Sequence, residues 1–390
     1  MLLNLSPLEI WLWGATALLF IIYFVYTYIY YTAPIKLYQD DTKQPHATEN
    51  PSVSVIIYAK NESENLQKTL PLLLAQDYPN FEIIVINDGS TDESYELLQT
   101  FEAKHKNLYH SFVPEGVKYL SRKKLALTIG IKAAKYDVLL FTDANCYPSS
   151  TQWIASMARN FVPGIDIVLG FCSYPVSNSL KQKIVALDNL LFGINYLAAA
   201  IRKSPYMGNG RNLAYRKELF FKQKGYAKTL NLQAGEDDLF INSVANKNNT
   251  FVELSSESIV EQIPFDRFKT WKEMKASRNS TIPYLKGGHI FGSRLGGFIQ
   301  LSLLIALLLL IMIACCTIQL WSLLGALTLY IIYYSLKLTT LHRWASQLQK
   351  QKLIRWVPLL SICLAFYNSY IYIYRLFKGN RDYTFRIDNR

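Results

Sequence analysis

Two long apolar blocks bracket a segment of ordinary soluble composition, and this layout restricts the possible folds more than any other feature. The first block, residues 8–31, contains a single charged residue, Glu9. Its length suits a membrane-spanning helix. Neither the basic n-region nor the small-residue cleavage site of a secretory signal is present. We therefore expect an uncleaved N-terminal transmembrane anchor over residues 1–34.

The C-terminal region, residues 291–390, contains the other apolar sequence. Gly296 to Leu336 is too long for one span and predicts two helices joined by a tight turn near Thr317–Gln319. A third block, Trp356 to Tyr374, is interrupted by polar residues, including Asn368. It could be a span, a re-entrant piece or an interfacial helix, so this region has two or three transmembrane or interfacial helices.

Lys and Arg residues flank the apolar blocks unevenly. None precedes the first block, whereas Lys36, Lys43 and Lys60 follow it. Because positive charge marks the cytoplasmic side, we expect an integral protein of the inner or plasma membrane with a cytoplasmic middle segment. The basic residues after residue 374 would lie outside if the third block spans, and they do not fit this orientation.

The formal net charge of +12 is best explained by contact with anionic lipid headgroups of the bilayer. No basic stripe interleaved with aromatic residues occurs in the middle segment, so no nucleic-acid partner is expected. The five Cys form no CxxC pair and the five His show no metal-ligand spacing, which argues against a disulfide framework or a zinc site.

The middle segment, residues 35–290, alternates short apolar runs with helical patterns. This alternation predicts an α/β domain with a parallel sheet covered by helices. In open sheets of this kind the ligand lies at the carboxyl ends of the strands. The expected strands are 52–59, 81–88, 108–113 and 137–143, and the expected helices follow them at 63–75, 89–101 and 122–134.

Acidic side chains follow three of these strands. Glu62 comes after the first, Asp88 after the second, and Asp143 ends the fourth, with Asn145 two residues later. In an extended segment, Asp143 and Asn145 point to the same side. Few partners that could neutralise these acids are evident in the sequence. A divalent cation, or a ligand rich in hydroxyl and amide donors, is therefore expected at this edge.

The segment "SVIIYAKNESENLQKTLPLLLAQDYPNFEIIVINDGSTDES" closely resembles the opening of family 2 inverting glycosyltransferases. The resemblance extends over roughly residues 50–285, in the right order. "SRKKLAL" is similar to the family's GKxxAL segment, "TDAN" stands in the place of DxD, "YMGNGRNLAYRKELF" resembles the acceptor-side segment, and "AGEDDLF" resembles the ED motif. It implies a GT-A fold, a Rossmann-like nucleotide-sugar domain flanked here by transmembrane helices.

The resemblance also implies roles for individual residues. Asp88 would bind the nucleobase with Glu62 close by, and Lys123 would face the diphosphate. Asp143 and Asn145 would hold the ribose and a Mg²⁺ or Mn²⁺ ion on the diphosphate.

Asp237 would be the general base, with Glu236 as the alternative, while Asp238 would be structural at a helix start. The acceptor-side residues would be Gly208, Gly210 and Asn212, although the glycines could simply serve a turn.

Two departures from the family pattern affect the expected function. Asn145 replaces the last acid of DxD, which predicts a weaker metal site. "KASRN", residues 275–279, replaces the QxxRW motif of processive members, so Arg278 could pair with diphosphate oxygens but no Trp platform is present. We expect an inverting transferase that moves one sugar at a time from a UDP-sugar to a lipid-linked or glycan acceptor. The alternatives are a processive synthase, an inactive nucleotide-sugar-binding scaffold and a transport component.

Overall fold

The computed structural model describes residues 6–40, 50–114, 121–287, 289–348 and 350–378. Its centre is a seven-stranded sheet in the order β3-β2-β1-β4-β8-β6-β9. The strands β1, β2, β3 and β4 are parallel, whereas β8 is antiparallel to both β4 and β6. The sheet comprises β1 (Val53–Ala59), β2 (Phe81–Asn87), β3 (Leu108–Phe112), β4 (Val138–Asp143), β6 (Ile167–Leu169), β8 (Leu213–Arg216) and β9 (Thr250–Val252).

The four predicted strands and the three helices between them are confirmed within a few residues. The parallel arrangement expected of these four strands is confirmed. The second half of the sheet, for which the sequence analysis predicted no strands, contains the antiparallel β8. The sheet is therefore mixed. The intervening helices are α3 (Ser63–Leu74), α4 (Ser94–Lys104) and α5 (Arg122–Ala133).

Helices cover both faces of the sheet, which explains why its central strands are apolar on both sides. On β1, Val55 and Ile57 face the helices α3, α4 and α6 (Trp153–Ala158). Ile56, between them, faces the other side and packs in the same cluster as α5 and α7 (Leu180–Ile201). The register aligns Ile56 with Ile84 of β2, so each layer is continuous across the strands.

A second, three-stranded sheet has the order β5-β10-β7. It begins directly after β4 and joins the middle of the chain to residues 260–262. Its strands are β5 (Cys146–Pro148), β7 (Cys172–Ser173) and β10 (Val260–Gln262). The remaining helices of this part are α8 (Lys217–Lys222), α9 (Asp238–Val244) and α10 (Phe268–Thr281), with short 3₁₀ turns at Ala227–Thr229, Ser256–Ser258 and Ile282–Tyr284.

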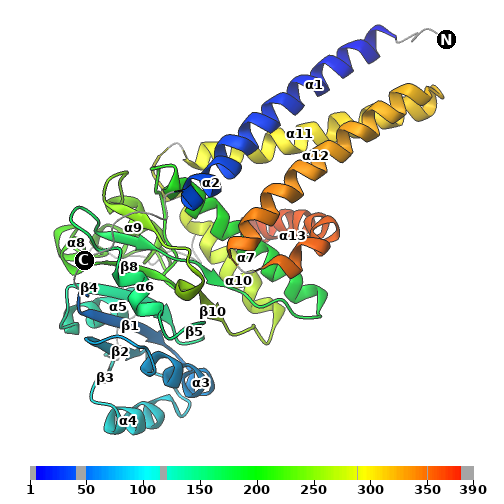
Figure 1. The fold of residues 1–390 in the computed structure, drawn as a ribbon. Coiled ribbons are helices and arrows are strands. Elements are labelled where there is room, and N and C mark those ends of the chain that lie inside the picture. The colour runs from blue at the N-terminus through cyan, green and yellow to red at the C-terminus, as the bar shows by residue number, and fades with distance from the viewer. Residues whose placement is uncertain (1–5, 41–49, 115–120, 288, 349, 379–390) are drawn as a thin grey trace, which may run out of the picture.

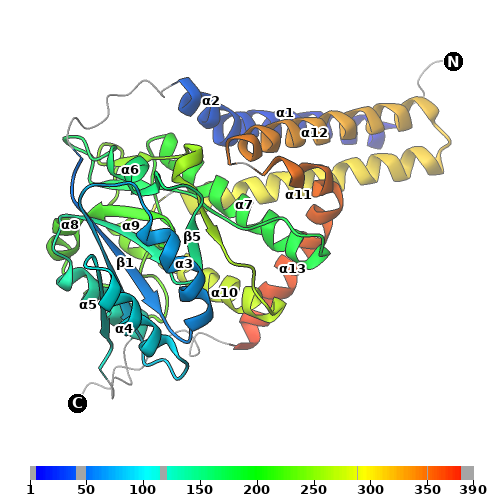
Figure 2. The same ribbon diagram turned by 60° about the horizontal axis from the view of Figure 1, so that its bottom comes forward.

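Three long helices project together from the globular part (Figures 1 and 2). They are α1 (Pro7–Thr27), α11 (His289–Cys316) and α12 (Leu320–Gln347), and the turn between the last two falls where the sequence predicts it. A π-helical turn, Tyr28–Thr32, continues α1 into α2 (Ala33–Asp40). Tyr23 of α1 packs against Tyr333 of α12 with ring centroids 4.8 Å apart.

Five helices of the described residues are long and apolar enough to cross a membrane. One of them is α7, which the sequence analysis did not single out. In its most apolar stretch of 18 residues, 78% of the residues are buried within the protein, so α7 belongs to the core of the globular part. Apolar length alone does not distinguish a buried core helix from a span.

The third apolar block forms α13 (Val357–Lys378), preceded by a 3₁₀ turn at Gln351–Trp356. It packs against α7 and α10. Leu360 and Leu364 are buried in this contact, whereas Ile362 and Phe366 on the other face are exposed. A helix with one face on the protein and an apolar outer face fits the interfacial alternative better than an independent span.

Candidate active site

Asp88 lies at the carboxyl end of β2 and is surrounded by donors. The Tyr58 hydroxyl donates to its Oδ2 atom at 2.8 Å, and Arg122 Nε donates to Oδ1 at 2.5 Å. Lys60 Nζ is 3.5 Å from the same carboxylate. Only 1% of Asp88 is exposed. The carboxylate is thus held rigidly at the strand end, where the sequence places it.

Glu62 is close to the same edge, at the residue that precedes α3. It accepts a hydrogen bond from Asn65 Nδ2 at 2.5 Å. Burial raises the pKa of Glu62 above its usual value, and the neighbouring charge of Asp143 adds to this effect. Both effects disfavour the charged form of this carboxyl group.

Lys123 is the centre of the charged network. Its Nζ atom is 3.2 Å from Asp143 Oδ1 and 3.2 Å from Glu236 Oε1. Burial alone would lower the pKa of Lys123, but Asp143, Glu236 and then Asp237 outweigh burial and raise it. Lys123 is therefore a permanent cation that links the end of β4 to the "GED" loop.

Arg211 holds the other oxygen of Asp143. Its Nε atom lies 3.1 Å from Asp143 Oδ2. Burial would raise the pKa of Asp143, yet Lys123 and Arg211 together lower it. The expectation that these acids have few neutralising partners is therefore wrong. The sequence analysis missed Arg211, whose signal was a cation inside the glycine-rich "GNGRN" segment.

Asp237 caps the N-terminus of α9. Its Oδ1 atom accepts from the N–H of Asp238 at 2.8 Å, and its Oδ2 atom accepts from the N–H of Gly210 at 2.7 Å. A Cβ at Gly210 would meet Asp237 Oδ2 at 3.2 Å. The close approach of this backbone to the carboxylate thus requires the glycine.

Asp238 is buried and turned away from this contact. It accepts from the N–H of Leu239 at 2.7 Å and from the Thr281 hydroxyl. Burial, and next the charge of Asp237, raise the pKa of Asp238. Its bonds tie α9 to the end of α10, in agreement with the structural role expected from the sequence.

A buried lysine, Lys124, is hydrogen-bonded to the loop that precedes Glu236. Lys124 Nζ donates to three backbone oxygens, those of Thr229, Leu232 and Ala234, at 2.5, 3.0 and 2.8 Å. Burial lowers the pKa of Lys124 to about 8. This side chain fixes the loop that positions Glu236 and Asp237 relative to α5.

A cavity of about 170 Å³ is lined by Lys123, Asp143, Arg211, Glu236, Asp237 and Asp238. Gly208 also lines it, and a Cβ there would meet Ile241 and Leu213 at 3.2 Å. A second cavity of about 320 Å³ shares part of its wall and extends to Leu364 and Asn368 of α13. The residues common to both cavities are Phe192, Met207, Asp238, Arg278 and Thr281.

Arg278 faces this shared wall, and Asp188 of α7 positions it. Arg278 Nη2 is 3.4 Å from Asp188 Oδ2, and the guanidinium lies 3.8 Å from the centre of the Phe192 ring. Trp271 Nε1 donates to Asp188 at 3.2 Å, and Lys275 Nζ pairs with it as well. The sequence analysis did not identify Asp188, because it lies in a different helix.

Four of the expected site residues are not among those that line the cavity: Glu62, Asp88, Asn145 and Asn212. Glu62 and Asp88 lie at the strand ends described above. Asn212 is fully buried: its amide donates to the backbone oxygens of Phe171 and Ser258 at 3.0 and 2.7 Å and accepts from Trp153 Nε1 at 3.0 Å. Its side chain therefore holds the acceptor-side segment from within the core and does not point into the cavity. The Asn145 side chain accepts from Cys146 Sγ at 3.4 Å and lies outside the set of residues that line the cavity.

The fit of these residues to a divalent cation is limited. Within the described residues there is no group of three or more His, Cys, Asp or Glu side chains that could hold a metal ion. Asp143 offers one carboxylate, and Glu236 Oε2 is a buried atom that has no hydrogen-bond partner among the residues that the structure describes. Such a donor set suits an ion whose remaining ligands are phosphate oxygens.

Comparisons with known proteins identify the class of this domain. Residues 54–220 match the sequence profile of Glycosyl transferase family 2. The chain therefore contains a glycosyltransferase domain of family 2, and its fold is of the GT-A type. Mannosyltransferase PcManGT from Pyrobaculum calidifontis, solved in complex with GDP-Man and Mn²⁺, shares the fold with a TM-score of 0.56 and 17% identity. That alignment covers 87% of this chain and 98% of the mannosyltransferase.

Two curated relatives match over shorter stretches. Glycosyltransferase AglE of Haloferax volcanii is 29% identical over 44% of this chain and 53% of its own length. Poly-beta-1,6-N-acetyl-D-glucosamine synthase of Staphylococcus epidermidis is 39% identical over 24% of this chain and 21% of its own length. The chain thus matches about half of the first relative and about a fifth of the second.

Proposed function

We propose that the protein is a membrane-bound inverting glycosyltransferase that transfers a sugar from a nucleotide sugar to a membrane-associated acceptor. The observation that supports this most directly is the convergence of Lys123, Asp143 and Asp237 on one cavity at the carboxyl ends of the strands. A cation beside a carboxylate cluster suits a diphosphate, and a carboxylate held by two backbone N–H groups suits a positioned base.

In the proposed mechanism, Asp88 and Glu62 bind the nucleoside, and the diphosphate lies against Lys123 and Arg278. Asp237 removes the proton from an acceptor hydroxyl. That oxygen forms a bond to the anomeric carbon while the bond between this carbon and the diphosphate oxygen breaks. The nucleoside diphosphate leaves with the electron pair, and the configuration inverts in a single displacement.

A divalent ion, Mg²⁺ or Mn²⁺, would stabilise charge on the departing diphosphate. Asp143 would hold it together with diphosphate oxygens. The Mn²⁺ of the mannosyltransferase that shares the fold supports metal use. Because Lys123 and Arg211 already neutralise Asp143, the free protein should bind such an ion weakly.

The acceptor side of the proposal rests on the cavity that extends to α13. Its wall includes Leu191, Ile282, Leu285 and Leu364, together with the amides of Asn195 and Asn368. An apolar wall with a few amides suits an acceptor with an apolar carrier and hydroxyl groups. Because α13 has an exposed apolar outer face, this cavity adjoins the surface that we assign to the membrane, which favours a lipid-linked or surface-glycan acceptor.

A processive synthase is the second candidate, and the poly-N-acetylglucosamine synthase relative favours it. Against it, Trp271 of α10 is buried and bonded to Asp188, so it offers no stacking platform to a growing chain. Mass spectrometry of the product separates the two: a single added sugar supports the proposal, and a ladder of additions supports the synthase.

The direct test is release of nucleotide from UDP- and GDP-sugars by the purified full-length protein, with and without membrane lipid extract. Acceptor-dependent release from one donor is the expected result, with UDP-sugars preferred. Absence of release from every donor, together with donor binding, would instead indicate a nucleotide-sugar-binding scaffold.

A further inference from the structure

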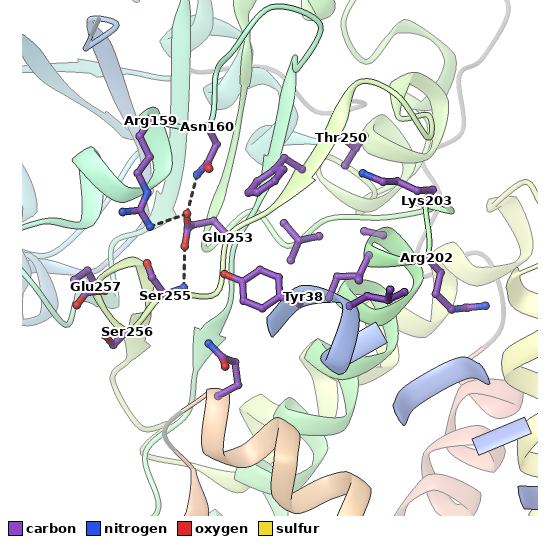
Figure 3. A pocket seen from close by; sticks show the side chains of 16 residues that line it. Tyr38, Arg159, Asn160, Arg202, Lys203, Thr250, Glu253, Ser255, Ser256 and Glu257 are labelled. Carbon is purple, nitrogen blue, oxygen red and sulfur yellow. Dashed lines mark hydrogen bonds and ion pairs between the residues drawn. The ribbon is translucent and has the colours of Figure 1, made fainter. Parts of the chain in front are cut away.

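A further cavity, separate from the two described above, lies on the far edge of the main sheet, away from the candidate active site. It has a volume of about 930 Å³ and is enclosed by α2, the C-terminal end of α7, the edge strand β9 and residues 253–257 (Figure 3). None of its lining residues lines either cavity of the candidate site. It therefore has no part in the reaction proposed above.

The cavity lies where the projecting helices meet the globular part. Leu254 lies just beyond β9. Its N–H donates to the hydroxyl of Tyr38 at 2.9 Å, and Gln347 Nε2 donates to the backbone oxygen of Leu254 at 3.0 Å. Tyr38 belongs to α2 and Gln347 ends α12. Thus α2, which continues the projecting helix α1, and α12 are both hydrogen-bonded to the rim of the cavity.

The two sides of the cavity differ in charge. On one side, Glu253 is neutralised by Arg159 Nη2 at 3.1 Å, Asn160 Nδ2 at 2.8 Å and the N–H of Ser255 at 2.8 Å (Figure 3). On the other side, Arg202 and Lys203 follow the end of α7 (Figure 3). The Arg202 guanidinium lies 4.1 Å from the centre of the Tyr30 ring.

Two buried nitrogen atoms of the lining residues, the Nε atoms of Arg159 and Arg202, have no hydrogen-bond partner within the described part of the chain. Buried donors are rarely left unpaired in native proteins. Both atoms are themselves buried, so they would reach a ligand in the cavity only after their side chains turn toward it.

Lys203 adds an independent observation. Its backbone adopts φ +58°, in the left-handed region. Helices usually place glycine at this position because it has no Cβ. A lysine at this position destabilises the backbone, and its exposed ammonium group lies at the rim of the cavity. Such strained residues are found preferentially at ligand sites.

We propose that this cavity binds the phosphate-bearing headgroup of an anionic lipid, drawn from the leaflet next to the catalytic domain. Arg202 and Lys203 would supply the charge and donate hydrogen bonds to the phosphate oxygens. Leu37, which is exposed, together with Ile201 and Phe251 would contact the first part of the acyl chains. The inference rests on the membrane insertion of α1, α11 and α12 that is part of the proposed function.

The test uses the full-length protein in dodecyl maltoside micelles. Its melting temperature is followed while dioleoyl phosphatidylglycerol, dioleoyl phosphatidylcholine or glycerol 3-phosphate is added. Saturable stabilisation by phosphatidylglycerol alone is expected, because a ligand that binds only the folded protein raises the melting temperature. Lys203→Gly should require about fivefold more of this lipid, the effect of one basic residue near an anionic surface. Arg202→Gln should act in the same direction.

Lys224→Gly is the matched control. Lys224 also has a left-handed backbone, with φ +62°, and follows α8 at the end of the molecule away from α1 and α12 (Figures 1 and 2). Both substitutions remove one charge and relieve the same strain, so neither should lower the melting temperature without lipid. Lys224→Gly should leave the lipid dependence unchanged.

Three results would overturn the inference. They are an unchanged lipid dependence in Lys203→Gly, an equal loss in Lys224→Gly, and equal stabilisation by glycerol 3-phosphate, which would indicate a site for free phosphate. Donor turnover measured on the same samples keeps the proposed function separate. If the protein binds the lipid but releases no nucleotide, the proposed transferase activity is contradicted and the proposed lipid site is not.

Discussion

The carboxylate of Asp237 accepts a hydrogen bond of 2.7 Å from the backbone N–H of Gly210. This contact joins the N-terminus of α9 to the acceptor-side segment. It leaves the carboxylate in the cavity with a fixed orientation. If Asp237 is the base, its position depends on this single backbone contact and on the N–H of Asp238.

The first prediction concerns the base itself. Asp237→Asn should lower turnover by about 10²–10⁴-fold, the usual contribution of a positioned base. Donor binding should stay close to the wild-type value, because the base acts mainly in the transition state. Nucleotide release and donor affinity measured on the same preparation check both parts.

Asp238→Asn is the control for this prediction. The raised pKa of Asp238 favours the neutral carboxyl group, and an amide can take over its contacts with Leu239 and Thr281. This variant should fold and keep most of its turnover. Near-normal turnover in Asp237→Asn would move the assignment to Glu236.

The second prediction concerns the glycine. Gly210→Ala places a Cβ 3.2 Å from Asp237 Oδ2, so the carboxylate must shift by a few tenths of an ångström. Turnover should fall at least tenfold with little change in the melting temperature. Gly208→Ala should do the reverse, because its Cβ would press on the buried side chains of Ile241 and Leu213. Equal effects of the two variants on stability would contradict this distinction.

The third prediction concerns the metal. Activity should disappear in excess chelator and return with Mn²⁺ or Mg²⁺, and Asp143→Ala should not be rescued by either ion. Because Lys123 and Arg211 neutralise Asp143, isothermal titration should detect binding of Mn²⁺ only when nucleoside diphosphate is present. Full activity in chelator would leave charge stabilisation to Lys123 and Arg278 alone.

The fourth prediction concerns Lys124. Lys124→Met should destabilise the protein by about 3 kcal/mol or more, because it leaves three backbone carbonyl groups without their donor at about 1–3 kcal/mol each. Turnover should fall as well, since the loop before Glu236 loses its attachment to α5. Lys132→Met, an exposed position on the same helix, should change neither quantity.

The pH dependence of stability offers a second check on Lys124. Burial lowers its pKa to about 8 in the folded protein. Between about pH 8 and 10.5 the unfolded chain therefore binds more protons at this group, so its contribution to stability rises with pH. The stability difference between wild type and Lys124→Met should widen over this interval. A constant difference would show that the lysine stays charged.

The fifth prediction concerns orientation. A reporter fused after Tyr38 should lie in the cytoplasm, and one near Gln319, between α11 and α12, should lie outside. The bias of Lys and Arg around the first two apolar blocks is the reason. A Tyr38 fusion found outside would reverse the orientation and separate the cavity from cytoplasmic nucleotide sugars.

The sequence by itself determined the features that depend on local pattern. Runs such as "FEIIVIND" and "DVLLFTD" predict strands that are buried on both faces, because their central residues are apolar without interruption. Asp88 and Asp143 end these runs, because charged side chains do not continue into the core. The motif order then indicated the class of enzyme. The three projecting helices followed from apolar length alone.

Only the tertiary structure decided which charges meet. Arg211 and Asp143 are 68 positions apart in the chain, and neither lies in a pattern that names the other as its partner. The same holds for Asp188 and Arg278, which belong to different helices, and for α7, whose apolar sequence resembles a span but is covered by the sheet and α13. Burial in a folded protein depends on what packs around a segment, and local sequence does not contain that information.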